Sequence, residues 1–243
     1  MTYCVGLRLS RGLVFMSDTR TNAGMDNIST FRKMFTWAEE GETFITMLTA
    51  GNLATTQAVV SLIDERNRAP SERTPGILGL PSMFQVAKHV GQILREVIAQ
   101  HAEDGQRAET YFNATIIVGG QVKGGEPRMF LIYPEGNFIE ASEDTPFLQI
   151  GEFKYGRPIL VRAFDPEMSF EAAVKLLLVS FDSTIKANLS VGLPLDVQVY
   201  ENDSLQRGTR HRIKGDDPEY RRISAGWGDA LKQAFDSLPD VPL

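Results

Sequence analysis

Residues 3–18 have the sequence YCVGLRLSRGLVFMSD, and this stretch decides how the chain begins to fold. Apolar side chains occupy every second position of its first half, at Tyr3, Val5, Leu7 and Leu9. Such alternation is typical of a strand with one face turned toward a core. A polar turn at residues 10–12 then leads into a second apolar run at 13–17. The sequence therefore predicts that the chain opens with a β-hairpin.

Beyond this hairpin, segments of strand period and helix period follow one another. Further strands are predicted at residues 30–37, 43–48, 114–118, 129–133, 137–141 and 195–199. Helices, two of them begun by the N-caps Asn52 and Ser82, are predicted at residues 53–66, 82–98, 169–186 and 218–238. We expect an α+β fold in a single domain over residues 1–243, with two antiparallel sheets stacked face to face and helices covering the outsides.

The composition excludes several classes of function. The 25 Lys and Arg residues against 31 Asp and Glu give a formal net charge of −6, which disfavours binding to nucleic acid or to an anionic membrane. No stretch approaches the roughly 18 apolar residues of a membrane span. The single cysteine, Cys4, cannot form an internal disulfide, and the first residues lack the pattern of a secretion signal. We therefore expect a cytoplasmic protein.

The usual signatures of metal and nucleotide chemistry are absent from the sequence. It contains no G-x-S-x-G, H-E-x-x-H, G-x-x-x-x-G-K-[ST] or C-x-x-C motif. We interpret His89, His101 and His211 as surface or packing residues. The glycine pairs at 119–120 and 124–125 precede a predicted strand instead of a helix, so they indicate a turn and not a phosphate site. No metal and no cofactor is expected.

The remaining candidate for chemistry is the beginning of the chain. Thr2 follows Met1, and threonine is small enough for a methionine aminopeptidase to expose it. The exposed residue would carry both a hydroxyl and a free α-amine. Because such an amine titrates at about pH 7.7 to 8.0, it can accept the hydroxyl proton without a histidine.

Several short segments in the first 53 residues share a resemblance to one family. These segments are YCVGL at 3–7, SDTR at 17–20, NAG at 22–24, STFRK at 29–33 and TAGNL at 49–53. Together they resemble the proteasome β-type subunits of the N-terminal-nucleophile hydrolases, above all the bacterial ancestral β-subunit group called Anbu. The resemblance covers essentially the whole chain. It implies a four-layer αββα sandwich whose subunits assemble with copies of themselves into rings.

The resemblance also implies roles for particular residues. Thr2 falls at the position of the family's nucleophile, and Lys33 falls at the lysine that eases proton loss from its hydroxyl. Asp18 falls at the aspartate that keeps this lysine charged. Gly51 falls at the glycine whose backbone N–H stabilises the oxyanion. The implied activity is hydrolysis of peptide bonds by a threonine-type endopeptidase.

Two segments depart from the family's pattern. Where the family has Gly-Ser-Gly near the active threonine, residues 151–153 are Gly-Glu-Phe, so Glu152 replaces a serine and is expected to hold the amine or Lys33. Residues 188–192, with the sequence NLSVG, can be aligned with the family's Asp-x-x-Ser-Gly-Gly in two ways, and neither alignment preserves both the aspartate and the serine. By position, the primary specificity pocket is expected to be formed by Thr21, Phe31, Thr49 and Leu53, which suits a small to medium apolar side chain.

Other hypotheses remain open on the sequence alone. The same fold could serve an amidase that acts on a small amide, or a catalytically silent scaffold subunit of a ring. The substrate of the endopeptidase hypothesis is a peptide or unfolded protein, with an ATP-driven unfoldase as a plausible partner. Cys4 is the next candidate nucleophile, although a strand cysteine is more often a small packed residue.

Overall fold

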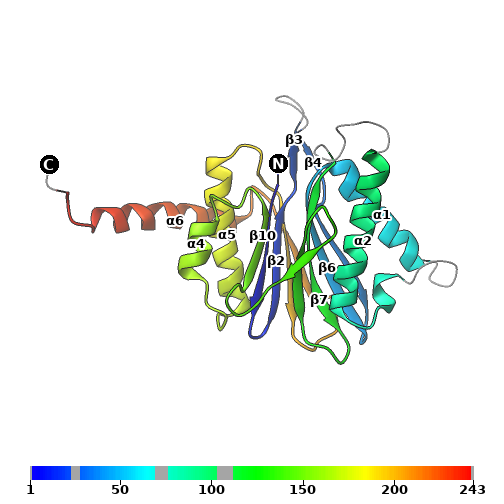
Figure 1. The fold of residues 1–243 in the computed structure, drawn as a ribbon. Coiled ribbons are helices and arrows are strands. Elements are labelled where there is room, and N and C mark those ends of the chain that lie inside the picture. Colours follow the sequence, from blue (N-terminus) through cyan, green and yellow to red (C-terminus); the bar gives the residue numbers. More distant parts are fainter. Residues whose placement is uncertain (1, 23–27, 69–75, 103–111, 242–243) are drawn as a thin grey trace.

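The computed structural model of the chain describes residues 2–22, 28–68, 76–102 and 112–241. Met1 and two residues of the NAG segment, Ala23 and Gly24, lie outside the described residues, as does the side chain of His101. Most of the described chain belongs to two sheets and the helices that cover them (Figure 1).

The first sheet contains the hairpin at the start of the chain. Its strands are ordered β10-β1-β2-β11-β12, and each neighbouring pair is antiparallel. Their bounds are β1 Tyr3–Leu9, β2 Gly12–Asp18, β10 Phe147–Gly151, β11 Leu195–Glu201 and β12 Thr209–Ile213. The N-terminal hairpin thus lies inside this sheet, with the later strands added on either side of it.

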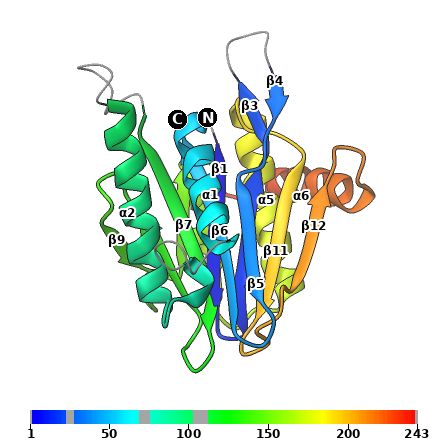
Figure 2. The same cartoon turned by 90° about the vertical axis from the view of Figure 1, so that its right-hand side faces the viewer.

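The second sheet lies face to face with the first. Its strands are ordered β5-β6-β7-β8-β9 and are also antiparallel. Their bounds are β5 Met34–Glu39, β6 Thr43–Gly51, β7 Ala114–Val122, β8 Arg128–Ile132 and β9 Phe138–Glu140. A separate short hairpin of β3 (Arg20–Asn22) and β4 (Ile28–Thr30) extends beyond one end of the sheets (Figure 2).

Helices cover the outer face of each sheet (Figures 1 and 2). The second sheet is covered by α1 (Leu53–Arg68) and α2 (Met83–Ala102), with the 3-10 turn η1 (Ile77–Gly79) between them in sequence. The first sheet is covered by α4 (Arg157–Ala163) and α5 (Phe170–Ala187). The last helix, α6 (Pro218–Asp236), packs its first turns against α5 and then projects away from the body (Figure 1).

Three apolar layers hold these elements together. Leu7, Leu177 and Phe181 belong to the layer between the first sheet and its helices, and a similar layer lies under α1 and α2. Between the sheets, glycine permits a close approach, because a Cβ atom at Gly6 would lie 2.3 Å from the sulfur of Met129. The two sheets therefore share a closely packed interior, and this packing holds the ends of their strands in place.

Most of the predicted elements are confirmed. The α+β class, the two antiparallel sheets and the opening hairpin are present, as are helices close to the four predicted ranges. Two predicted caps are confirmed as well, since the backbone N–H of Thr55 donates to the side chain of Asn52 at 3.1 Å and that of Gln85 donates to Ser82 at 3.3 Å. Hydrophobic period and cap chemistry were therefore sufficient for the long elements.

The strand predicted at residues 30–37 is wrong in its first half. β4 ends at Thr30 and β5 begins at Met34, so residues 31–33 form a connection between two strands. The shorter elements β3, β10, β12 and α4 were not predicted. Each is only three to seven residues long, and β12 is an exposed edge strand with no apolar alternation. Within the described part of the chain, no helix is both long and apolar enough to cross a bilayer.

Candidate active site

Thr2 lies directly before β1 and is held by the end of β10. Its carbonyl oxygen accepts a hydrogen bond from the backbone N–H of Glu152 at 2.7 Å, and its exposed fraction is 7%. Gly151 has a φ of +82°, and a Cβ atom there would lie 1.9 Å from the Thr2 carbonyl oxygen. Only glycine permits this approach, so β10 fixes the main chain at the predicted nucleophile.

Asp18 and Lys33 form a buried ion pair beside Thr2. Asp18 is the last residue of β2 and is fully buried, while Lys33 is 4% exposed. The Lys33 Nζ atom lies 2.7 Å from Asp18 Oδ1 and donates a second hydrogen bond to the carbonyl oxygen of Arg20 at 2.6 Å. The structure therefore pairs the two residues that the sequence predicted to pair.

Backbone donors complete the surroundings of the Asp18 carboxylate. The N–H of Tyr3 donates to its Oδ1 at 3.0 Å, and the N–H of Gly192 donates to its Oδ2 at 3.4 Å. Burial raises the pKa of the Asp18 carboxyl, and it outweighs the lowering by Lys33 and by the two backbone donors. This carboxylate therefore also anchors the main chain of Tyr3, the residue directly after Thr2.

Gly51 ends β6 at the edge of the same site. Its φ is +117°, and a Cβ atom there would lie 2.4 Å from the carbonyl oxygen of Asn113. A side chain at this position would therefore force the backbone to move. The next residue, Asn52, donates its N–H to the same Asn113 oxygen at 2.9 Å and caps α1, so the main chain around Gly51 is held from both directions.

A small cavity of about 40 Å³ joins these residues. Six of the predicted site residues line it, namely Thr2, Thr21, Lys33, Thr49, Gly51 and Leu53. Phe31 does not line this cavity and is 37% exposed, whereas its neighbour Arg32 does line it. The pocket is therefore more polar than the sequence predicted, because residues 31–33 are a connection in which strand alternation does not apply.

Glu152 contacts Thr2 through its main chain and not through its carboxylate. Among the described residues, the Glu152 side chain forms no hydrogen bond or ion pair, so the expected contact with Lys33 is not present in the structure. Its half-buried side chain follows Gly151 directly. A role toward the α-amine stays a prediction.

The structure also shows site residues that sequence reasoning missed. Arg32, Ala50 and Thr56 line the cavity, and Gly192 donates to Asp18 from the altered segment at 188–192. Thr56 follows Leu53, which also lines the cavity, by three residues of α1, so helical spacing could have placed it beside the cavity. No local signal marks Gly192, because its contact with Asp18 depends on how α5 returns the chain to β11.

The alternative candidates for chemistry lie in other surroundings. Cys4 is fully buried between the sheets, and burial raises the pKa of its thiol well above the ordinary value. His89 is buried on α2 beside Arg66, and His211 is exposed on β12. The glycines at 119–120 belong to β7, and a β-strand follows 124–125. Within the described residues, no group of three or more His, Cys, Asp or Glu side chains could hold a metal ion.

Three solved structures with 45–48% sequence identity to this chain come from one group of proteins. Anbu (ancestral beta-subunit) from Yersinia bercovieri is 46% identical, with 99% of each chain covered and a TM-score of 0.92. A Gly-1 mutant of Anbu from Hyphomicrobium sp. strain MC1 is 48% identical over the whole of both chains, also with a TM-score of 0.92. The chain belongs to the Anbu family. No protein-family model and no curated protein matches it.

A third Anbu structure is described as a helical assembly. This helical assembly of the Anbu complex from Pseudomonas aeruginosa contains a chain 45% identical to the present one. The comparison covers 99% of this chain and 98% of that chain, with a TM-score of 0.92. The resemblance stated from the sequence is therefore confirmed at the level of the family.

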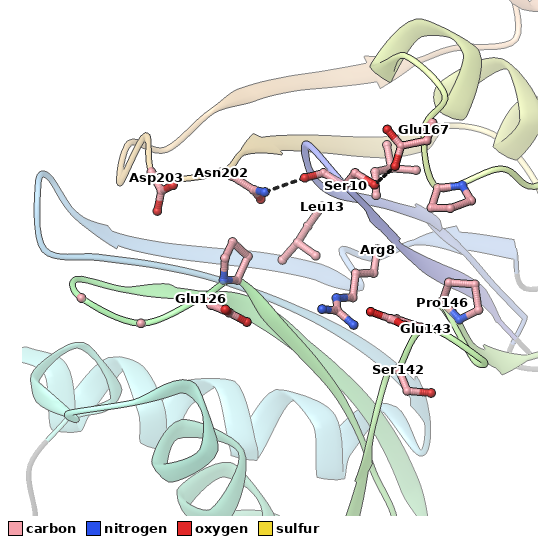
Figure 3. A pocket seen from close by; sticks show the side chains of 15 residues that line it. Arg8, Ser10, Leu13, Glu126, Ser142, Glu143, Pro146, Glu167, Asn202 and Asp203 are labelled. Carbon is pink, nitrogen blue, oxygen red and sulfur yellow. Dashed lines mark hydrogen bonds between the residues drawn. The ribbon is translucent and has the colours of Figure 1, made fainter.

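A larger cavity of this chain, about 800 Å³, lies at the opposite end of the sheets from Thr2. Figure 3 shows the side chains that line it. It is lined by the turns that join β1 to β2, β7 to β8 and β11 to β12, with side chains that include Arg8, Glu126, Glu143, Glu167 and Asp203. None of the predicted site residues lines it. The candidate active site is thus separated from this cavity by the length of the strands.

Proposed function

We propose that the chain is a threonine-type N-terminal-nucleophile hydrolase that cleaves peptide amide bonds after removal of Met1. One observation carries the proposal. Thr2, Lys33 and Gly51 line a single cavity, and a buried Asp18 pairs with Lys33 at 2.7 Å. Because an isolated charge is costly inside a protein, Asp18 keeps Lys33 charged where it can act on the Thr2 hydroxyl.

The proposed reaction uses Thr2 twice. Its free α-amine accepts the hydroxyl proton while Oγ attacks the carbonyl carbon of the scissile amide, and the Lys33 ammonium favours the developing alkoxide. The carbonyl oxygen becomes an oxyanion that the N–H of Gly51 stabilises. When the C–N bond breaks, the leaving amine takes the proton from the Thr2 ammonium, and an ester remains on Oγ.

Water completes the proposed cycle. The α-amine of Thr2 accepts a proton from water as its oxygen attacks the ester carbonyl, with the N–H of Gly51 again facing the oxyanion. The C–O bond then breaks, Oγ takes back a proton, and the carboxylic acid product leaves. No other residue has to donate or accept a proton in this scheme.

We also propose that the chain associates with copies of itself, which is supported by the helical assembly of its relative from Pseudomonas aeruginosa. The αββα layers of the N-terminal-nucleophile hydrolases are the fold on which this proposal rests. Three expectations for this chain stay predictions. They are a single β-subunit domain over residues 1–243, a cytoplasmic location and an unfoldase partner.

The test is covalent labelling followed by mass spectrometry. A β-lactone probe should add once to the wild-type protein, and the labelled peptide should begin at Thr2. The Thr2→Ala variant should not be labelled, whereas Cys4→Ala should be labelled normally. Retained Met1, or an adduct on Cys4, would overturn the proposal. Turnover of small amides without turnover of peptides would instead favour the amidase hypothesis. If the wild-type protein forms no adduct at all, the result would favour the hypothesis of a catalytically silent scaffold subunit.

A further inference from the structure

The cavity beside Thr2 carries an unbalanced positive charge. Among the described residues, its lining contains two cations, Arg32 and Lys33, and no carboxylate. The charge of Lys33 is matched by Asp18 beneath the cavity. Arg32, in contrast, is exposed and forms no hydrogen bond or ion pair with any described residue. Its guanidinium therefore contributes a positive charge that the described part of the chain does not neutralise.

The surroundings of Arg32 increase this positive potential. Arg210 on β12 is close enough to Arg32 for the two to interact electrostatically. The pKa of Arg210 lies below its ordinary value, mainly because of partial burial and further because Arg32, Arg212 and Arg207 carry like charges. Asp196 opposes this charge, since its carboxylate lies 3.9 Å from Arg210 and also accepts two hydrogen bonds of 2.8 Å from Arg212. One carboxylate therefore faces two guanidinium groups. An anion entering the cavity thus meets a net attraction.

The cavity also has a size that limits its occupant. Its volume is about 40 Å³, and one water molecule needs about 10–15 Å³ on the same scale. This leaves room for roughly three heavy atoms, which is the size of a carboxylate group. The hydroxyl groups of Thr21 and Thr49, which also line the cavity, can donate hydrogen bonds to its oxygens.

We propose that Arg32 makes this site select substrates with an aspartate or glutamate side chain next to the scissile amide bond. The proposal rests on the hydrolase function proposed above and names the substrate class of the same site. Arg32 acts as a specificity-determining residue because its planar guanidinium can bind both oxygens of the carboxylate. An acidic substrate side chain thus takes the place of the apolar substrate side chain that was expected from the sequence.

Matched substrates test this inference in the assembled protein. Three coumarin amides of the form acetyl-Ala-Ala-X, with X as Asp, Asn or Leu, differ only at the selected side chain. Wild-type protein should cleave the Asp substrate about 10-fold or more faster in kcat/KM than the isosteric Asn substrate. Arg32→Gln should lower kcat/KM for the Asp substrate to that for the Asn substrate, and Arg32→Glu should invert the preference. Arg8→Gln, in the cavity at the opposite end, should leave the preference unchanged.

A binding measurement separates this inference from the hydrolase proposal. The Thr2→Ala variant cannot turn over substrate, so its affinity for acetyl-Ala-Ala-Asp-amide and the Asn analogue reports the cavity alone. Preferred binding of Asp that is lost in Thr2→Ala/Arg32→Gln supports the role of Arg32, even if the wild type proves inactive and the hydrolase proposal fails. Equal binding of Asp and Asn, or a preference that survives Arg32→Gln, overturns the inference even if Thr2 is labelled.

Discussion

The two ends of the stacked sheets each hold a cavity, and they differ in what lies beneath the surface. At the end where β1 begins, a cavity of about 40 Å³ rests on Asp18 and Lys33, which are both almost completely buried. At the opposite end, a cavity of about 800 Å³ is lined by turns whose charged side chains, including Glu126 and Glu143, face solvent. The larger cavity therefore lies at one end of the molecule and the buried charges at the other.

The comparison separates volume from buried charge, and the proposed chemistry lies with the buried charge. Burying a carboxylate and an ammonium has a desolvation cost that a purely structural site could avoid with apolar side chains. An exposed ion pair such as Lys123–Glu42 at the far end has no such cost and contributes little. We therefore expect substitutions at the small cavity to alter function, and matched substitutions at the large one to leave it unchanged.

The largest difference is expected between the two lysines. Lys33→Met should abolish β-lactone labelling and lower the free energy of unfolding by about 3–5 kcal/mol, because Asp18 is left buried without its cation. Denaturant unfolding and probe labelling measure the two effects.

The control for Lys33→Met is the exposed lysine at the other end. Lys123→Met should cost less than about 1 kcal/mol and leave labelling unchanged. The double variant Asp18→Asn/Lys33→Met should regain much of the lost stability but no labelling. Recovery of labelling in the double variant would contradict a role for Lys33 in the chemistry.

Two glycines with positive φ give the second comparison. Gly51→Ala should lower the rate of labelling about 100-fold or more, because a Cβ atom 2.4 Å from the Asn113 oxygen displaces the proposed oxyanion donor. Gly124, in the turn at the far end, has a φ of +78° and no atom within 4 Å of such a Cβ. Gly124→Ala should therefore show only a modest loss of stability and a normal labelling rate. Equal rates for both variants would remove Gly51 from the proposed mechanism.

A smaller difference in labelling rate is expected between variants of the half-buried Glu152 and the exposed Glu143. Glu152→Gln is expected to slow labelling by no more than about 5-fold, since a solvent-screened charge near the α-amine contributes under about 1 kcal/mol. Glu143→Gln at the large cavity is the matched control and should have no effect. Labelling rates at a fixed probe concentration measure both, and an unchanged rate in Glu152→Gln would leave only the main chain of that residue at the site.

The smallest effect is expected at His89 on α2, which lines neither cavity. It contributes to the change in stability that the wild-type protein shows when the pH is lowered. Burial, and then the charge of Arg66, lower the pKa of His89 below its ordinary 6.5. The unfolded chain therefore takes up this proton first, so stability is complete above the ordinary pKa and falls as pH falls through the folded one. Thermal unfolding at about pH 7 and about pH 5 should show a smaller difference in His89→Gln than in the wild type. An equal difference would show that His89 contributes nothing to acid sensitivity.

The sequence allowed the long elements to be predicted because each carries its own period. Alternation over residues 3–17 and helical spacing over 82–98 are repeated often enough to be recognised without tertiary information. β12, with the sequence TRHRI, has no such signal, because it is an exposed edge strand that pairs only with β11. Its formation depends on the sheet that it joins.

The candidate site was predictable to a different extent. The pairing of Asp18 with Lys33 followed from a resemblance to a family, since 15 residues separate them in the sequence and no local pattern links them. Arg32 could not be placed, because strand alternation would turn it away from the side on which Lys33 lies. Both residues instead lie in the connection between β4 and β5, where strand alternation does not apply, and both line the cavity.

The buried pair of Asp18 and Lys33 also limits how this site can change during evolution. A single substitution at either position passes through an intermediate with one unmatched charge in the interior, and selection against unstable proteins removes such intermediates. Neutralising both positions requires two mutations to become established together. Among descendants of this chain that lose their substrate, the two residues should therefore persist long after the surface of the cavity has diverged.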